Sequence, residues 1–316
     1  MLRISLALAL ASALAACHHD AAPTPPSNRL PPSAPGAAVA DPLGFLPIDS
    51  DVVIGINVRA LRASALWAEY QPRLTQAIGP QLADVQRSCG FDPIQAIDSI
   101  TVGAISKGQD AVIVIRGLDR DRTVACLERN PIPDTTVTSD HGVLLLANKS
   151  GHRNLVTFAD RTTLVLQGST APTPESLRTV LHSGVPLRGS PGFVGTFERL
   201  EPGATLWMVI NGKASFFDKF ADAVIRPVAI FGTIRISDGF AAKAHVRLAT
   251  PEAAAQATAM AQGQIGQAMA MFDRLEVAAD ADVMTVTAEM KLDKVRSLVA
   301  MVASLFGSVG GPATSP

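Results

Sequence analysis

The same order of strand-like and helix-like segments occurs twice along this chain. In the first half, strand and helix patterns alternate at 52–58, 60–88, 99–105, 110–116 and 121–129, followed by short apolar runs between 142 and 167. In the second half they alternate at 205–210, 215–230, 231–236, 240–248, 251–272, 275–279, 284–290 and 293–306, after linking helices at 174–182 and 191–200. Both halves therefore read β-α-β-β-α-β-β. This order predicts an α+β fold of two related units, with helices on one face of antiparallel sheets.

Two hairpins in the second half have a register that the alternation of apolar and polar residues predicts. Ile236 is expected opposite Phe240, with Gly239 in the left-handed conformation at the end of a three-residue loop. Ala279 is expected opposite Met284. These registers give a basic stripe, Arg235, Lys243, His245 and Arg247, beside an acidic stripe, Glu276, Asp280 and Glu289. The paired stripes are a candidate docking face for another envelope protein, although the solvated side of a one-sided sheet gives the same pattern.

Composition excludes two classes of protein. The 316 residues carry 27 basic and 28 acidic side chains, a net charge of −1, which argues against a nucleic-acid-binding surface. The mean hydropathy of +0.25 suggests membrane contact, yet after the N-terminal segment no apolar run approaches the 18 residues of a spanning helix. The chain is long enough for about two structural units.

The N-terminus has the pattern of an export signal. A single Arg3 precedes an apolar run from Ile4 to Ala16, too short to span a bilayer. Leu14-Ala15-Ala16-Cys17 resembles the lipobox of bacterial lipoproteins. This resemblance implies that Cys17 becomes the first mature residue and carries diacylglycerol and an N-acyl chain such as palmitate. We therefore expect a cell-envelope protein, anchored in the outer membrane facing the periplasm or at the cell surface; a plain signal peptide is the alternative.

The organisation of the whole chain follows from these patterns. We expect a signal peptide at 1–16, a lipid-anchored Ala- and Pro-rich tether at 17–44, a first α+β unit at 45–185, a second at 186–306 and a disordered tail at 307–316. His18, His19 and Asp20 lack further ligands at metal-site spacing, so they are expected to be a solvated start to the tether.

Two cysteines remain after Cys17. Cys89 and Cys126 are too far apart in sequence for a CxxC redox or zinc motif, and an exported protein is expected to oxidise them to one disulfide. Because Cys89 ends one helical stretch and Cys126 lies inside another, the bridge would join two helices. A catalytic cysteine is the alternative.

Several short motifs resemble a widespread group of exported bacterial proteins of unknown function. They are Phe45-Leu46-Pro47-x-Asp49, Gly90-Phe91-Asp92-Pro93, the paired short strands of 142–167 and Leu187-x-x-Ser190-Pro191. The resemblance covers most of the mature chain and implies a duplicated α+β body in the periplasm or at the surface. It implies no activity and no catalytic residues.

No motif for catalysis, cofactor binding or metal binding is present. The chain lacks G-x-S-x-G, H-E-x-x-H and G-x-G-x-x-G, and its histidines are scattered. The sequence therefore predicts a non-enzymatic interaction or scaffold module. The alternative is a carrier of a lipid or hydrophobic peptide, with an apolar groove lined by Phe216, Phe220, Met260 and Met269, although packing against a sheet explains the same residues. A hydrolase, which would need a buried Ser–His–Asp cluster, is a third hypothesis.

Overall fold

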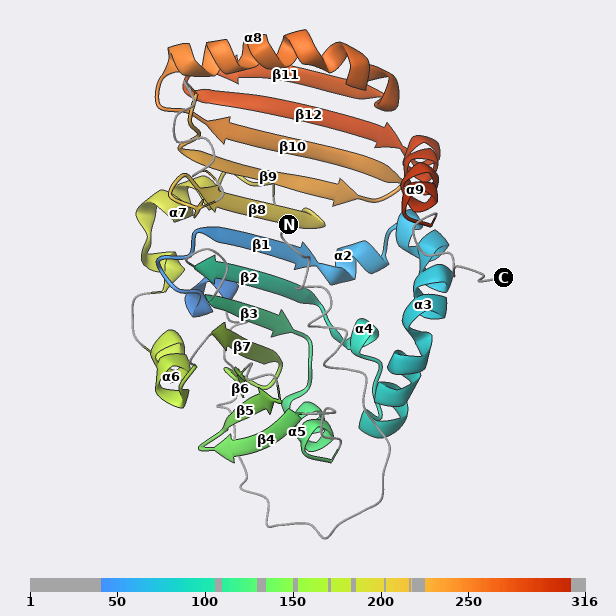
Figure 1. Ribbon diagram of the computed structural model, residues 1–316, viewed down its shortest axis with the longest axis vertical. Helices are drawn as coiled ribbons and strands as arrows, with labels where there is room; N and C mark the ends of the chain where they lie inside the picture. The colour runs from blue at the N-terminus through green and yellow to red at the C-terminus, as the bar shows by residue number, and fades with distance from the viewer. Residues whose placement is uncertain are drawn as a thin grey trace, which may run out of the picture.

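The protein is built on a single antiparallel sheet. The computed structural model describes residues 41–105, 110–129, 135–149, 153–169, 172–182, 186–201, 203–215, 217 and 225–307. Within them, twelve strands pair in the order β11-β12-β10-β9-β8-β1-β2-β3-β7-β6-β5-β4 (Figure 1). The strands are β1 (Val52–Asn57), β2 (Ser99–Ile105), β3 (Asp110–Arg116), β4 (Thr135–Asp140), β5 (Val143–Asn148), β6 (Arg153–Phe158), β7 (Thr163–Ser169), β8 (Leu206–Asn211), β9 (Ala229–Ile236), β10 (Gly239–Arg247), β11 (Arg274–Asp280) and β12 (Val283–Lys291).

The sheet order shows the duplication that the sequence predicted. Read outward from the centre, the first half runs β1-β2-β3-β7-β6 and the second runs β8-β9-β10-β12-β11. In each half a helix follows the third strand, and the last strand of the half, β7 or β12, returns to pair with that third strand, β3 or β10. The first half continues with an additional hairpin, β4 and β5. The α+β class and the two related units are confirmed.

The two halves share this sheet because their first strands pair with each other. β1 and β8 are antiparallel neighbours, with Val53 opposite Val209 and Gly55 opposite Trp207. Their pairing satisfies backbone groups that separate sheets would leave at two open edges. The segments that precede the two strands also meet, since the amide of Leu187 donates to the carbonyl oxygen of Leu46 at 2.8 Å.

Helices and 3-10 turns surround the sheet (Figure 1). The described helices are α2 (Val58–Arg62), α3 (Ala65–Cys89), α4 (Pro93–Ala96), α5 (Arg120–Arg129), α6 (Pro174–His182), α7 (Pro191–Phe197), α8 (Pro251–Ala268) and α9 (Leu292–Gly307), with 3-10 turns η1 (Pro42–Phe45), η3 (Leu187–Gly189) and η5 (Met269–Met271). α3 continues through Pro72 and Pro80, where the sequence suggested interruptions. Thr250 caps α8 as expected, accepting a hydrogen bond from the amide of Ala253 at 3.2 Å.

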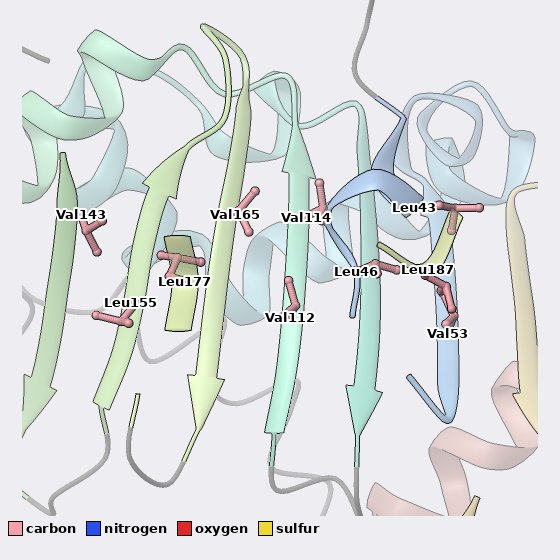
Figure 2. Close-up of a cluster of buried hydrophobic side chains, with 10 residues drawn as sticks. All are labelled: Leu43, Leu46, Val53, Val112, Val114, Val143, Leu155, Val165, Leu177 and Leu187. Atoms are coloured by element: carbon pink, nitrogen blue, oxygen red, sulfur yellow. The ribbon is translucent and has the colours of Figure 1, made fainter. Parts of the chain in front are cut away.

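The first half of the sheet is covered on both faces, where one covered face was expected. We call face 1 the side that carries Val53, Val112 and Val165. There, buried residues of η1, η3 and α6 lie over the strands, and Figure 2 shows Leu43, Leu46, Leu177 and Leu187 beside the strand valines. On the opposite side, face 2, residues of α4 and α5 pack with Ile115, Leu144 and Leu164. Strands such as β3, apolar on both faces, need both layers.

The second half has an apolar face and a polar face. On face 2, Val277, Ala288 and Met290 are buried, and α8 and α9 contact the strands that carry them. Figure 1 shows α8 lying along the edge strand β11, where the side-chain Nε2 of Gln262 donates a hydrogen bond to the carbonyl oxygen of Val277 at 2.9 Å. Face 1 becomes polar beyond β9, which is the one-sided burial that the sequence predicted.

Both predicted hairpin registers are confirmed, with Phe240 opposite Ile236 and Met284 opposite Ala279. The predicted conformation of Gly239 is wrong, because its φ is not positive. Glycine is needed there for a different reason. A Cβ at position 239 would lie 2.6 Å from the carbonyl oxygen of Met290 on the neighbouring strand.

Candidate functional site

The four basic residues predicted for docking lie together on face 1 of the second half. Lys243 is opposite Thr233 and Thr287, and His245 is opposite Phe231 and Thr285, so one surface carries them all. We call this surface, which extends from β9 to β11, the open face. It comprises Arg235, Lys243, His245, Arg247, Thr285, Thr287, Glu276, Asp280 and Glu289.

Charges on the open face are only partly paired within the molecule. Arg235 pairs with Glu201 at 2.8 Å, and Arg274 bridges the two acidic strands through Glu276 at 2.8 Å and Glu289 at 3.2 Å. Lys243 and Arg247 form no ion pair with any described residue. The basic stripe therefore has positive charge available to a partner.

His245 marks the border between the covered and the open parts of face 1. Its ring stacks on Phe231 with the centroids 4.8 Å apart, and its Nδ1 is 2.9 Å from the hydroxyl of Thr285. Partial burial, together with the positive charges of Lys243 and Arg199, lowers the pKa of His245 below its usual value, while Glu201 opposes the shift. The ring is therefore neutral at neutral pH. It contacts Phe231, which belongs to the buried cluster against which Phe193 of α7 packs, and it also borders the open face.

Face 1 also carries a cavity that was not predicted from the sequence. It has a volume of about 780 Å³ and lies where β1 and β3 end and β2 begins, beside the chain that follows α7. Its floor includes the small residues Ser99 and Thr101, which the register places opposite Asn57 and Gly55. Trp207 is opposite Gly55, and its indole ring occupies the space that any side chain at position 55 would need.

The two ends of this cavity differ in chemistry. At one end, Trp207 packs edge-on against Phe197 of α7, with ring centroids 4.9 Å apart. At the other end is Arg116 of β3, which is opposite Ser99 and lines the cavity. Sequence reasoning missed these residues because they come from three strands and a helix; the nearest signal is the arginine that ends the apolar strand 110–116.

The other site residues predicted from the sequence are a pair of cysteines, four groove residues and the lipidated Cys17. Cys89 and Cys126 form the expected disulfide, with Cα atoms 4.8 Å apart, and it joins α3 to α5. Met260 and Met269, two of the four predicted groove residues, have exposed fractions of 56% and 53% and do not line the cavity beside α7. Cys17, Phe216 and Phe220 lie outside the described residues.

No metal-binding group of three or more His, Cys, Asp or Glu side chains is found in the part of the chain that the structure describes. In that same part, none of the helices has both the length and the apolar character needed to cross a bilayer.

Comparison with known proteins gives the fold and nothing finer. No family model matches the sequence, and no curated protein matches it. Among solved structures, crystal form III of TP0453, a Treponema protein, aligns with a TM-score of 0.50 and 11% identity, over 83% of this chain and 98% of that one. Crystal form I aligns with a TM-score of 0.51 and 12% identity, over 84% and 98%. At this identity the likeness shows a shared α+β fold.

Proposed function

We propose that this protein is an exported, lipid-anchored envelope protein that works as a non-enzymatic interaction module. The lipobox-like Leu14-Ala15-Ala16-Cys17 supports the anchor, and the Pro-rich segment that follows supports a tether. The single observation that carries the binding role is the open face, because this part of face 1 is solvated while the same face of the first half is covered by η1, η3 and α6.

The chemistry of the open face suits a protein partner of mixed charge. Thr285 and Thr287 offer hydroxyl groups on a flat floor, with Lys243 and Arg247 on one side and Glu276 on the other. Complementary charge at an interface favours partner selection and fast association more than raw affinity. Arg274 already bridges Glu276 and Glu289, so we expect a partner whose contact surface carries acidic groups facing Lys243 and Arg247 and a basic group facing Asp280.

The alternative functions have less support. For an apolar carrier, the two described groove residues Met260 and Met269 are exposed on α8 and η5, so a groove would have to involve residues outside the described part. For a hydrolase, two described histidine contacts matter. His141 pairs with Asp140, but both side chains are exposed, and His245 contacts Thr285 without a carboxylate hydrogen-bonded to it among the described residues.

The anchor is tested by Cys17→Ser in the full chain, expressed in a bacterium that makes lipoproteins. The parent protein should incorporate an alkyne-labelled fatty acid and sediment with membranes, and the variant should do neither. Labelling of the variant, or membrane sedimentation of both proteins without label in the parent, would show that Cys17 is not the anchor.

The open face is tested by placing a photo-crosslinking amino acid at Thr285 in the anchored protein. A discrete crosslinked partner should form in cells, and Lys243→Glu with Arg247→Glu should abolish it. The matched control is Arg73→Glu with Arg153→Glu, which reverses two exposed arginines elsewhere and should leave the crosslink intact. Equal crosslinking in all three proteins, or none in the parent, would reject the open face as a docking surface.

A further inference from the structure

The cavity beside α7 has polar groups that the protein itself does not use. Arg116 makes no side-chain hydrogen bond or ion pair with any described residue, and neither do the hydroxyls of Ser99 and Thr101, which line the same hollow. Thr101 is almost fully buried, with an exposed fraction of 4%. An arginine that lines the same hollow as two hydroxyl groups, one of them on the residue opposite it, is a strong arrangement for binding an oxyanion, because Arg can donate two parallel hydrogen bonds to a carboxylate.

Most carboxylates around the cavity are already neutralised. Asp98 pairs with Arg59 at 2.8 Å, Glu201 pairs with Arg235 at 2.8 Å, and Asp41 pairs with Arg188. Glu198 forms no ion pair with a described residue, but it is exposed at the end of α7, on the Trp207 side of the hollow. The positive end of the cavity is therefore the Arg116 end, and a ligand anion has one preferred orientation.

The other end of the cavity is aromatic and rigid. The ring of Trp207 lies over Gly55 on β1, two strands away from Arg116 on β3, which corresponds to about 10 Å across the sheet. The edge-on contact with Phe197 holds the indole in place. This spacing between Trp207 and Arg116 matches a ligand with a flat aromatic ring system and a carboxylate on a short side chain.

We propose that this cavity binds a small aromatic organic anion, with its carboxylate on Arg116, Ser99 and Thr101 and its ring against Trp207 and Phe197. The volume of about 780 Å³ lies in the range of small-molecule sites. The proposal is independent of the proposed docking role, because the cavity lies over β1, β2 and β3 and shares no residue with the open face.

The test uses three probes of one shape: 1-naphthaleneacetate, its neutral amide, and 1-naphthylmethylammonium. Isothermal titration calorimetry on the folded protein should show submillimolar binding of the anion and at least about tenfold weaker binding of the other two. A Trp67→Phe background leaves Trp207 as the one tryptophan of the chain, so its indole N–H signal in NMR should shift on adding the anion.

Substitutions in the cavity then test which residues bind the carboxylate of the anion. Arg116→Gln should weaken binding of the anion about tenfold to hundredfold, the range expected for a lost hydrogen bond to a charged group, and should leave the amide unaffected. Thr101→Val, which keeps the shape of the floor, should give a smaller loss in the same direction. Arg153→Gln is the matched control on an exposed arginine of β6 and should bind like the parent.

Three results would overturn the proposal. They are equal affinity for all three probes, unchanged affinity of the anion in a folded Arg116→Gln protein, and absence of anion binding at millimolar concentration. Binding that leaves the Trp207 signal in place would put the anion at a different site and would equally reject it.

Discussion

The two halves of the sheet have the same strand order and different layers. Face 1 of the first half is buried under η1, η3 and α6, whereas face 1 of the second half is solvated from β10 to β11. The difference lies in the side chains of equivalent strands: β3 places Val112 and Val114 on this face, and its counterpart β10 places Lys243 and His245 there. A duplicated topology thus sets which strands pair, while the alternating residues decide which faces are covered.

The largest expected effect comes from testing this difference directly. Leu155→Ala removes a fully buried side chain from face 1 of the first half and should lower the free energy of unfolding by about 2–5 kcal/mol. Lys243→Ala, on face 1 of the second half, should change it by no more than about 0.5 kcal/mol. Urea unfolding measures both, and similar losses would mean that face 1 is buried in both halves.

The disulfide between α3 and α5 exists only in the first half, since the second half contains no cysteine. Replacing Cys89 and Cys126 together by alanine should lower the free energy of unfolding by about 2–4 kcal/mol, because the bridge restricts the unfolded chain. Adding reductant to the parent protein should lower its stability similarly. An unfolding midpoint that reductant leaves unchanged would show that the bridge contributes nothing.

The edge strand of the second half, β11, is protected by a helix. β11 is covered by α8 through the hydrogen bond from Gln262 to the carbonyl oxygen of Val277. Gln262→Ala should lower the free energy of unfolding by about 1 kcal/mol. Gln264→Ala, an exposed change on the same helix, should leave it unchanged. Equal effects of the two substitutions in urea unfolding would show that α8 covers the edge without help from this hydrogen bond.

The smallest effect concerns His245, at the border of the open face. Burial and the charges of Lys243 and Arg199 lower its pKa in the folded protein, so the unfolded chain binds a proton more readily. Stability should therefore fall as the pH drops below the usual histidine value of 6.5, and this contribution should be fully present above it. His245→Gln should flatten that part of the pH profile of stability; an unchanged slope would contradict the assignment.

Local patterns predicted the hairpins because their registers depend on neighbouring residues alone. Alternation from Ile234 to Leu248 specifies which side chains share a face, and a short loop leaves one pairing. The edge strand β4 was missed because Thr135–Asp140 is polar along most of its length and has no apolar face to detect. Pro72 and Pro80 suggested breaks in a helix that the structure continues from Ala65 to Cys89.

Long-range pairing was beyond the sequence. Nothing in the alternation of β1 or β8 says that Val53 lies opposite Val209, so the joining of the two halves could not be inferred. The cavity depends on that same pairing, because it brings Trp207 over Gly55 and next to Thr101. The basic residues of the open face were predictable, because Lys243, His245 and Arg247 alternate along one strand and therefore share a face.

The position of β1 has a mechanical consequence. β1 follows η1 in the chain and lies in the middle of the sheet, with β2 on one side and β8 on the other. A force applied from the N-terminal side therefore acts first on the buried Leu43 and Leu46 and then on the seam between the halves, before it reaches either outer edge. Extraction of this one strand would divide the sheet into two pieces, so resistance to pulling resides in the hydrogen bonds that flank β1.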